Sequence, residues 1–504
     1  MFESPQACRC GDFSFFDVKS IYNMEIKGKK VLLMGLGILG GGMSTARWLV
    51  SKGAKLTITD LKSEEYLKSS LERLSDLKGK IRFILGEHRG KDFLENEIIV
   101  VNPDVPITSP FLEIAKKNKK QIENELTLFY KFCPSLNIIA VTGTRGKTTT
   151  VNWTGHFIKN KRPYCLIVGN SPEKPLIDIL GKIKKDTPII IEEPSFLLEN
   201  VKDSNAPHIA VITNLYRDHI NRHQTMEKYA LTKSNIFKNQ NKDDFLILNY
   251  NDKWTGFFLK QNPISKVLFF SRNELPKSKD GIFVNKKMEV LIRFRGHEEK
   301  MLQVKDFVAN HGVHNMENFL VACLASFISN NFPKDISKII ATLPQIKFRE
   351  EKVYEDKFLE IYNDSTATSP EATVAALQRF GNGKINLILI SGGTDKELEF
   401  NNWAKNVKKF ILPGNLILLK GSATEKMKKL LGNYNFEEYG SLEKCLKKAI
   451  IRAKEFEEKR TIIIFSPASK SFEKFKNEFD RGEKFNLILK GLLAKVSRRL
   501  WYKN

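Results

Sequence analysis

The chain has 504 residues and a formal net charge of +24, from 82 Lys and Arg against 58 Asp and Glu. With 41% hydrophobic residues it can bury the cores of about three domains of ~150 residues each. No apolar run approaches the ~20 residues that cross a bilayer, so we expect no membrane-spanning segment. The lysines are spread along the whole chain, which favours anionic small molecules over nucleic acid as partners.

Residues 1–28 show no clear periodicity, and we expect them to form a leader before the first domain. This segment lacks the long apolar stretch of a secretory signal. The 6 cysteines are scattered and indicate no disulfide framework. We therefore expect a cytoplasmic protein, and a monomer.

A glycine turn follows the first predicted strand, which begins at Lys30. A helix (43–52) and a second strand (55–60) come next, in the order of a dinucleotide-binding fingerprint. Such a turn either holds a diphosphate or serves only to let a helix pack closely on a strand. The candidate substrate-binding residues of this segment are Gly35, Gly37, Gly40 and Asp60.

The loop Thr142-Gly-Thr-Arg-Gly-Lys-Thr-Thr149 lies between an apolar β-branched run and a segment compatible with a helix (151–159). Exposed N–H groups and the positive end of a helix dipole make such a turn an anion site. Lys147 can reach terminal phosphates, and the Thr148 hydroxyl can ligate Mg²⁺. The alternative is a solvated glycine turn that happens to carry a lysine. We interpret it as a nucleoside-triphosphate site, with candidate residues Gly143, Thr144, Arg145, Gly146, Lys147, Thr148 and Thr149.

Polar side chains follow further predicted strands of this sheet, at Asn170, Glu192 and Asp218-His219. Ligands gather at the carboxyl ends of strands in open α/β sheets, so we expect Glu192 to face Lys147 and to hold Mg²⁺. A histidine near a loop is more often structural than catalytic, but a strand end beside a phosphate loop favours a catalytic His219. Lys233, in a predicted helix (226–237), would in isolation be an ordinary solvated lysine.

Alternating strands and helices continue to the carboxyl terminus and indicate an α/β fold with three domains. We expect an N-terminal Rossmann-like domain, a central ATPase-type α/β domain with a phosphate loop, and a C-terminal Rossmann-like α/β domain. The expected boundaries are 29–135, 136–342 and 343–504. Further expected elements are strands at 81–85, 98–101, 245–249, 359–363, 385–390, 415–419 and 461–465, a β-rich stretch at 253–310, and helices at 111–120, 422–431 and 441–456.

Taken together, the motifs resemble the Mur ligase family. The shared pattern comprises the phosphate loop, Asp218-His219, Lys233, His314-Asn315-x-x-Asn318, Arg349 and Asn363-Asp364-Ser365-x-Ala367-Thr368. The glycine turn of the first domain, Gly392-Gly-x-x-Lys396 and Ser466-Pro-Ala-Ser-x-Ser471-Phe472 resemble the branch that adds D-glutamate to UDP-N-acetylmuramoyl-L-alanine. The resemblance covers roughly residues 29–495.

The resemblance implies an ATP-dependent amide ligation in peptidoglycan precursor synthesis, through an acyl phosphate. Catalytic roles fall on Lys147, His219 and Lys233. Two Mg²⁺ ions would be held by Thr148, Glu192, His219 and a carbamylated Lys233. ATP would also contact Asn315, Asn318, Arg349 and Asp364. The amino acid would contact Thr368, Lys396, Ser471 and Phe472, while the glycine turn and Asn170 would hold the UDP substrate.

Arg145 stands in the phosphate loop where the family usually has asparagine, and four further positions depart from the family pattern: Pro194, Leu197, Thr366 and Glu478. These four lie near the expected acceptor and amino-acid pockets, so a Mur-type ligase with another acceptor or amino acid, such as a glutamate-adding polyglutamate or cofactor ligase, stays open. An NAD-dependent oxidoreductase or a basic binding protein is the remaining alternative. The activity of an oxidoreductase would not account for the Gly-Lys-Thr loop.

Overall fold

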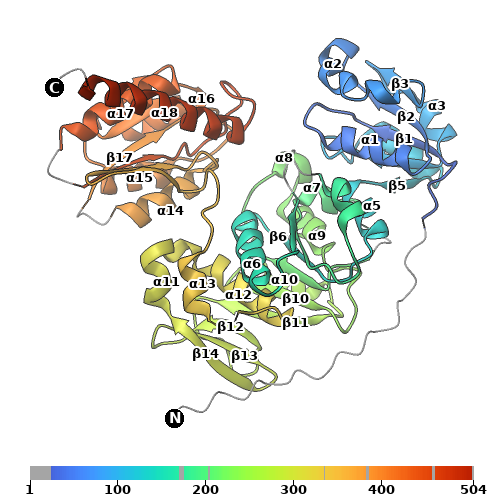
Figure 1. The fold of residues 1–504 in the computed structure, drawn as a ribbon, viewed down its shortest axis with the longest axis horizontal. Helices are drawn as coiled ribbons and strands as arrows, with labels where there is room; N and C mark the ends of the chain where they lie inside the picture. Colours follow the sequence, from blue (N-terminus) through green and yellow to red (C-terminus); the bar gives the residue numbers. More distant parts are fainter. Residues whose placement is uncertain are drawn as a thin grey trace. The chain divides into compact units, whose positions relative to one another are not determined.

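The computed structural model describes residues 24–169, 175–201, 205–333, 335–381, 385–456 and 460–501. Most of the expected leader and Asn170 lie outside these ranges. The chain forms three sheets and divides into two compact units (Figure 1). The first unit is Met1–Val304 with Glu317–Ile339, and the second is Lys305–Met316 with Ile340–Asn504.

The first sheet is parallel, in the order β3-β2-β1-β4-β5. Its strands are β1 (Lys30–Met34), β2 (Lys55–Asp60), β3 (Ile81–Leu85), β4 (Ile98–Val101) and β5 (Gln121–Glu123). Successive residues of β1 enter opposite cores, as the two-residue period of a strand requires: Val31 and Leu33 pack in one, Leu32 and Met34 in the other. Ile26 packs in the first of these cores, ahead of the expected domain start at residue 29.

The helices around this sheet are α1 (Gly41–Ser51), α2 (Glu64–Glu72), α3 (Gly90–Glu95), α4 (Pro110–Lys117) and α5 (Glu125–Phe132). The sequence analysis gave no element to α5, although Asn124 and Thr127 form a capping box at its start. Leu128 of α5 and Ile177 of the short helix η2 (Leu176–Lys182) pack in the first sheet's core. Other α5 residues, including Phe129, pack in the core of the second sheet. The two cores therefore share α5.

The second sheet has nine strands in the order β14-β13-β12-β11-β10-β9-β6-β8-β7. All pairs among strands β6 to β12 are parallel, and the β12–β13 and β13–β14 pairs are antiparallel. The strands are β6 (Ile138–Thr142), β7 (Leu166–Val168), β8 (Ile189–Glu192), β9 (Ile209–Ile212), β10 (Phe245–Asn249), β11 (Lys266–Ser271), β12 (Gly281–Val284), β13 (Glu289–Phe294) and β14 (His297–Gln303). The last strands account for the β-rich stretch that the sequence indicated.

The helices of this region are α6 (Lys147–Lys161), α7 (Ser195–Leu198), α8 (Ile220–His223), α9 (Met226–Ser234), α10 (Thr255–Lys260), α11 (Val304–His311), α12 (Met316–Ile328) and α13 (Ile336–Ala341). The expected start of the helix after the phosphate loop, Val151, is wrong. Gly146 in the left-handed region (φ 81°) is the N-cap, so α6 begins at Lys147. Lys147 and Thr148 thus lie in the first helical turn, where the dipole favours anions.

The third sheet has the order β15-β16-β20-β17-β18-β19, parallel except for the β15–β16 pair. Its elements are β15 (Glu351–Glu355), β16 (Leu359–Asn363), β17 (Asn386–Ser391), β18 (Leu416–Leu419), β19 (Glu437–Tyr439), β20 (Thr461–Phe465), α14 (Pro370–Phe380), α15 (Asn401–Phe410), α16 (Ser422–Leu431), α17 (Leu442–Lys454) and α18 (Glu478–Trp501). Helices α14, α15 and α16 share one core with the sheet, and α17 and α18 share the other. The three-domain α/β class is thus confirmed, while the boundaries at 135/136 and 342/343 stay a prediction.

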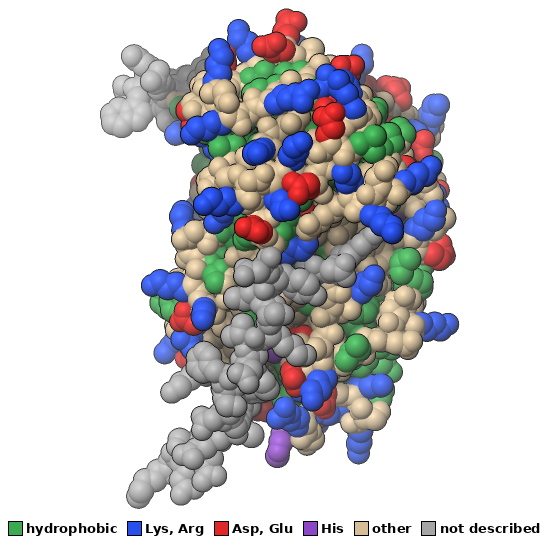
Figure 2. Space-filling view, turned by 90° about the vertical axis from the view of Figure 1, so that its right-hand side faces the viewer, with side chains coloured by type: hydrophobic (Ala, Val, Ile, Leu, Met, Phe, Trp, Pro, Cys, Tyr) green, Lys and Arg blue, Asp and Glu red, His purple; other side chains and the backbone are tan. Residues whose placement is uncertain are grey.

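On the face drawn in Figure 2, Lys and Arg side chains are dispersed among Asp, Glu and apolar side chains, without one continuous basic area. Within the described ranges, no helix is long and apolar enough to cross a membrane.

Candidate functional site

The phosphate loop connects β6 to α6 and depends on two glycines. Gly143 has φ 143°, and a Cβ there would lie 1.9 Å from the Thr213 Oγ1. Gly146 has φ 81°, and a Cβ there would lie 2.2 Å from the Asn318 Oδ1. Side chains at either position would clash, so the loop closes against β9 and α12 only with glycine.

The end of β9 holds the loop in place. Thr213 Oγ1 donates to the Arg145 carbonyl (2.7 Å), and Asn214 Nδ2 donates to the same oxygen (3.2 Å). The Arg145 N–H donates to Asn214 Oδ1 (2.9 Å). No role was predicted for Thr213 or Asn214. Their position after the strand next to β6 was the signal that could have found them.

Lys147 extends back over the loop that precedes it. Its Nζ donates to the carbonyls of Gly143 and Thr144, both at 3.1 Å. Asn318 also lies at the loop, because Thr150 Oγ1 donates to its Oδ1 (3.4 Å). The structure therefore brings Lys147 and Asn318, two predicted ATP-binding residues, to one loop.

Lys233, in α9, is a fully buried lysine with 1% of its surface exposed. Its Nζ donates to Thr142 Oγ1 (3.2 Å) and to the Gly143 carbonyl (3.0 Å), and lies 4.7 Å from the Tyr229 ring centre. Burial and the charge of Lys147 hold the pKa of Lys233 well below its ordinary value, against the opposing effect of Asp218 and Glu192. A lysine that looked ordinary in sequence thus has its amine against the phosphate loop.

The acidic strand ends lie around this amine. Glu192 ends β8, is buried, and pairs in register with Val141 of β6. His219 has φ 53° at the N-cap of α8, and its Nε2 lies 3.5 Å from Asp218 Oδ2. No group of three His, Cys, Asp or Glu that could hold a metal occurs in the described part of the chain. Among the four predicted metal ligands, only Glu192 and His219 are of these residue types. The other two are Thr148 and Lys233.

The glycine turn of the first sheet adopts left-handed backbone at Gly35 (φ 90°), Gly37 (φ 61°) and Gly40 (φ 114°). Asp60 Oδ2 accepts the N–H groups of Leu36 (2.8 Å) and Gly37 (3.1 Å), so this predicted substrate residue orders the turn itself.

Gly42, for which no role was predicted, lets α1 pack closely on the glycine turn. A Cβ on Gly42 would lie 2.1 Å from the Leu36 carbonyl oxygen. Gly40 is the N-cap of α1, with a positive φ that favours glycine.

In the second unit, Asp364 follows β16 and is buried. Its Oδ2 accepts from Ser466 Oγ (2.7 Å) and its Oδ1 from the Glu350 N–H (3.2 Å). Burial and the charge of Glu350 raise the pKa of Asp364 to about 8. Arg349 lies between Phe348 (φ 62°) and Glu350 (φ 45°), two non-glycine residues in left-handed backbone. Asn315 Nδ2 donates to the His311 carbonyl at 3.0 Å.

The predicted amino-acid contacts differ in exposure. Lys396 is exposed after β17, and Phe472 is 62% exposed. Ser471 is buried, and its Oγ has no hydrogen-bond partner among the described residues. Thr368 N–H donates to the Thr366 carbonyl at 2.9 Å, in the turn after Asp364.

A buried arginine, Arg481, connects the loops that carry these residues. Its side chain donates to the carbonyls of Ser365 (2.7 Å), Ser469 (3.1 Å) and Lys470 (3.1 Å). Burial lowers the pKa of Arg481 to about 10. Arg481 was not among the predicted site residues.

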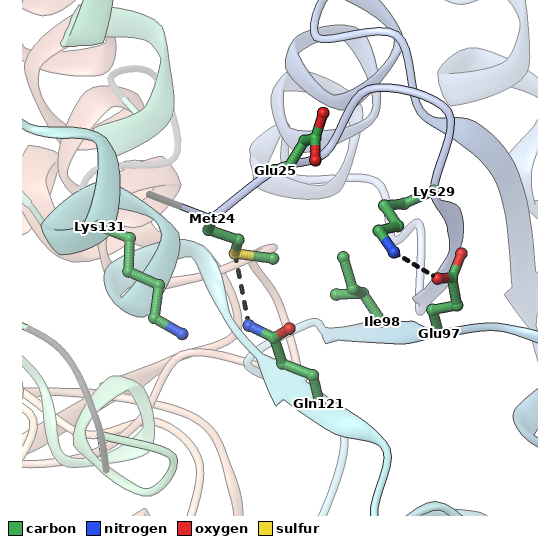
Figure 3. Close-up of a pocket in the computed structure, with 7 residues that line it drawn as sticks. All are labelled: Met24, Glu25, Lys29, Glu97, Ile98, Gln121 and Lys131. Atoms are coloured by element: carbon green, nitrogen blue, oxygen red, sulfur yellow. Dashed lines mark hydrogen bonds and ion pairs between the residues drawn. The ribbon is translucent and has the colours of Figure 1, made fainter. Parts of the chain in front are cut away.

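A separate cavity of about 410 Å³ lies at the amino ends of β1, β4 and β5, the opposite edge of the sheet from the glycine turn (Figure 3). It is lined by Met24, Glu25, Lys29, Glu97, Ile98, Gln121 and Lys131. Lys29 and Glu97 form an ion pair at 2.7 Å. No predicted site residue lines this cavity.

Comparison with known proteins decides the family. Residues 29–123 match the model of the Mur ligase MurD-like N-terminal domain, and residues 141–326 match the Mur ligase middle domain. The chain is 35% identical to a UDP-N-acetylmuramoylalanine–D-glutamate ligase of Roseiflexus over 92% of this chain and 99% of that one. It is 33% identical to the ligase of the same name from Borreliella burgdorferi, over 93% and 99%. The chain belongs to the Mur ligase family.

Solved Mur ligases share the fold. The chain resembles MurF ligase from Thermotoga maritima, solved in complex with ADP, with a TM-score of 0.53 and 15% identity over 94% of this chain and 96% of that one. Mur ligases are ATP-dependent enzymes that form amide bonds, and this chain is one of them. One edge of the second sheet carries the phosphate loop and Lys233, together with Glu192 and Asp218. This is the carboxyl edge, where parallel α/β sheets hold their ligands.

Proposed function

We propose that this Mur ligase adds D-glutamate to UDP-N-acetylmuramoyl-L-alanine at the expense of ATP. The acceptor carboxylate attacks the γ-phosphorus and releases ADP. The amine of D-glutamate then attacks the acyl phosphate, and phosphate leaves as the amide forms. The observation that carries the proposal is the buried Lys233 amine against the phosphate loop, in a chain that matches ligases of this name over nearly its whole length.

For ATP, the proposal assigns the loop residues Gly143 to Thr149 to the phosphates. The first N–H groups of α6 and the Lys147 ammonium supply positive charge where charge moves in phosphoryl transfer. Asn318, already against Gly146, and Asn315 are assigned to the adenine side. Arg349 and Asp364 of the second unit are assigned to further nucleotide contacts.

Thr148, Glu192, His219 and Lys233 would hold two Mg²⁺ ions, which when bound neutralise phosphate charge. Lys233 fits this role only after modification, because Mg²⁺ prefers oxygen ligands and an unmodified lysine offers only a nitrogen. Its lowered pKa favours the neutral amine, the form that adds to CO₂ and releases a proton to give a carbamate. The positive charge of Lys147 disfavours an ammonium group at Lys233 and would favour the negative charge of a carbamate there.

The glycine turn would hold the UDP portion, since Asp60 fixes its backbone with Gly35, Gly37 and Gly40 in left-handed conformations. Asn170 is assigned to the same substrate but lies outside the described residues. Lys396 would pair with a carboxylate of the amino acid, with Thr368, Ser471 and Phe472 beside it. The unsatisfied Ser471 hydroxyl supports a ligand there.

The remaining partners follow from the same chemistry. We propose a cytoplasmic monomer that takes small-molecule substrates and neither nucleic acid nor membrane. On the face drawn in Figure 2 the basic side chains are dispersed, whereas nucleic-acid binding needs them gathered on one surface.

Phosphate release in a coupled assay tests the proposal. Release should require ATP, UDP-N-acetylmuramoyl-L-alanine and D-glutamate together. Lys147→Ala should lower the rate about 100-fold or more, as the loss of one group that stabilises transition-state charge does. Lys159→Ala, an exposed lysine of the same helix, is the matched control and should leave the rate unchanged. Release without the UDP acceptor, or full activity of Lys147→Ala, would contradict the proposal.

A second candidate is a Mur-type ligase that takes a different amino acid. It is favoured by Thr366, whose hydroxyl donates to the Phe348 carbonyl (2.7 Å) where the family pattern has a lysine. Glu478, at the start of α18 where the pattern has an aromatic residue, adds an acid. A panel of amino acids in the same assay separates the two candidates. Faster release with a neutral or basic amino acid than with D-glutamate would establish the second.

A further inference from the structure

Arg222, in α8, donates hydrogen bonds to two different parts of the first unit. Its Nε and Nη2 contact the two carboxylate oxygens of Glu199, at 2.6 and 2.7 Å. Its Nη1 donates to the Pro103 carbonyl (2.7 Å), and its Nη2 also donates to the Val105 carbonyl (3.2 Å). The guanidinium therefore joins a carboxylate of the second sheet's domain to a loop of the first.

Each of these contacts belongs to a segment that carries candidate site residues. Arg222 shares α8 with its N-cap residue His219. Glu199 is the C-cap of α7, the helix that follows Glu192. The loop with Pro103 begins at Asn102, whose N–H donates to the Met34 carbonyl (2.9 Å) and whose Cβ lies 2.9 Å from the place of a Cβ on Gly35. One side chain in α8 thus binds the C-cap residue of α7 and the loop that packs on the glycine turn.

The geometry favours a fixed arrangement over a loose surface contact. The Glu199 side chain is 2% exposed and that of Arg222 is 21% exposed, so solvent screens this pair weakly. A two-point arginine–carboxylate contact also fixes the plane of the guanidinium. The remaining donors of that plane then point at the carbonyls of the 103–105 segment. Lysine has a single nitrogen and cannot make both sets of contacts.

We infer that Arg222 is a positioning residue for the UDP-linked acceptor. It holds the 102–105 loop against the glycine turn at a set place relative to His219 and Glu192, so that an acceptor bound at the turn presents its carboxylate to the phosphate loop. The inference rests on the proposed function, which places the acceptor at the glycine turn. It gives Arg222 no contact with ATP or with the amino acid.

Arg222→Gln should therefore separate the substrates. The KM and the calorimetric Kd for UDP-N-acetylmuramoyl-L-alanine should rise at least tenfold, and kcat should fall. The KM values for ATP and D-glutamate should stay within about twofold. Arg222→Lys keeps the charge without the fork and should show most of the same acceptor effect. If Arg222→Gln does not yield folded protein, the lysine variant carries the test.

Arg293→Gln is the matched control. Arg293 also pairs with a carboxylate, that of Glu298 at 2.7 Å, and donates to backbone carbonyls such as that of Pro276 at 2.9 Å. It lies in β13, on the antiparallel side of the same unit, and should leave all three KM values unchanged.

An unchanged acceptor Kd in Arg222→Gln, or equal losses for all three substrates, would overturn the inference and leave the proposed function standing. Failure of the unmodified protein to bind the UDP acceptor would instead remove the proposed function, and this inference with it.

Discussion

At the scale of single residues, Lys233 shows how burial changes the chemistry of a common side chain. On the exterior of α9 it would be protonated and solvated. Against Thr142 and Gly143, and facing the charge of Lys147, its neutral form is favoured. A neutral buried amine is a nucleophile, which is the physical basis for expecting a carbamate at this position and at no exposed lysine of the helix.

We expect protein equilibrated with ¹³C-labelled CO₂ to give a carbamate NMR signal that Lys233→Met abolishes. The same variant should lose activity about 100-fold, because it removes a proposed metal ligand beside the transferred phosphate. Lys228→Met, an exposed lysine of α9, should keep both signal and activity. A signal that survives in Lys233→Met would assign the carbamate elsewhere.

At the scale of elements, the strands and the phosphate loop could be predicted because their signals are local. Strands β2, β3 and β4 fall at their expected bounds, since each is a short β-branched or apolar run. The start of α6 could not be placed from apolar periodicity, because its first turn, Lys147 to Thr150, is polar and is fixed by the left-handed Gly146. Contacts between distant segments, such as those of Arg222 and Arg481, leave no local pattern in the sequence.

Gly42 is the element-scale feature whose substitution has the most direct consequence. An alanine Cβ would lie 2.1 Å from the Leu36 carbonyl, so α1 must move away from the glycine turn. We expect Gly42→Ala to lower the free energy of unfolding by about 1–3 kcal/mol in urea titrations. It should also raise the KM for the UDP acceptor.

Gly256→Ala is the control for this substitution. Gly256 lies in α10 with nothing within 4 Å of an added Cβ. Alanine there should stabilise the protein by about 0.5–1 kcal/mol, because glycine is a poor helix former. A Gly42→Ala variant as stable as the unmodified protein would mean that the helix adjusts without cost.

At the scale of the whole molecule, the first two domains are joined through a partly buried acid. Glu125 starts α5, which packs in the cores of both sheets, and its Oε1 accepts the Ile177 N–H at 3.2 Å. Burial raises the pKa of Glu125 from 4.5 to about 7, helped by the charge of Asp178 and opposed by backbone hydrogen bonds. The folded protein therefore holds this proton more tightly than the unfolded chain does.

The free energy of unfolding therefore falls as pH rises from about 4.5 to about 7. In this range the unfolded chain has already released the proton, while the folded protein still holds it. Glu125→Gln keeps an acceptor for Ile177 and removes the ionisation. The substitution should stabilise the protein more at pH 8 than at pH 5, by up to about 3 kcal/mol. This difference is smaller to the extent that solvent reaches the carboxylate. Urea titrations at both pH values measure this. Glu113→Gln, at an exposed acid of α4, is the control and should leave the difference between the two pH values as it is in the unmodified protein. If Glu125→Gln has the same effect at both pH values, Glu125 is ionised in the folded protein at pH 5, and the contact between the two domains does not respond to pH through this group.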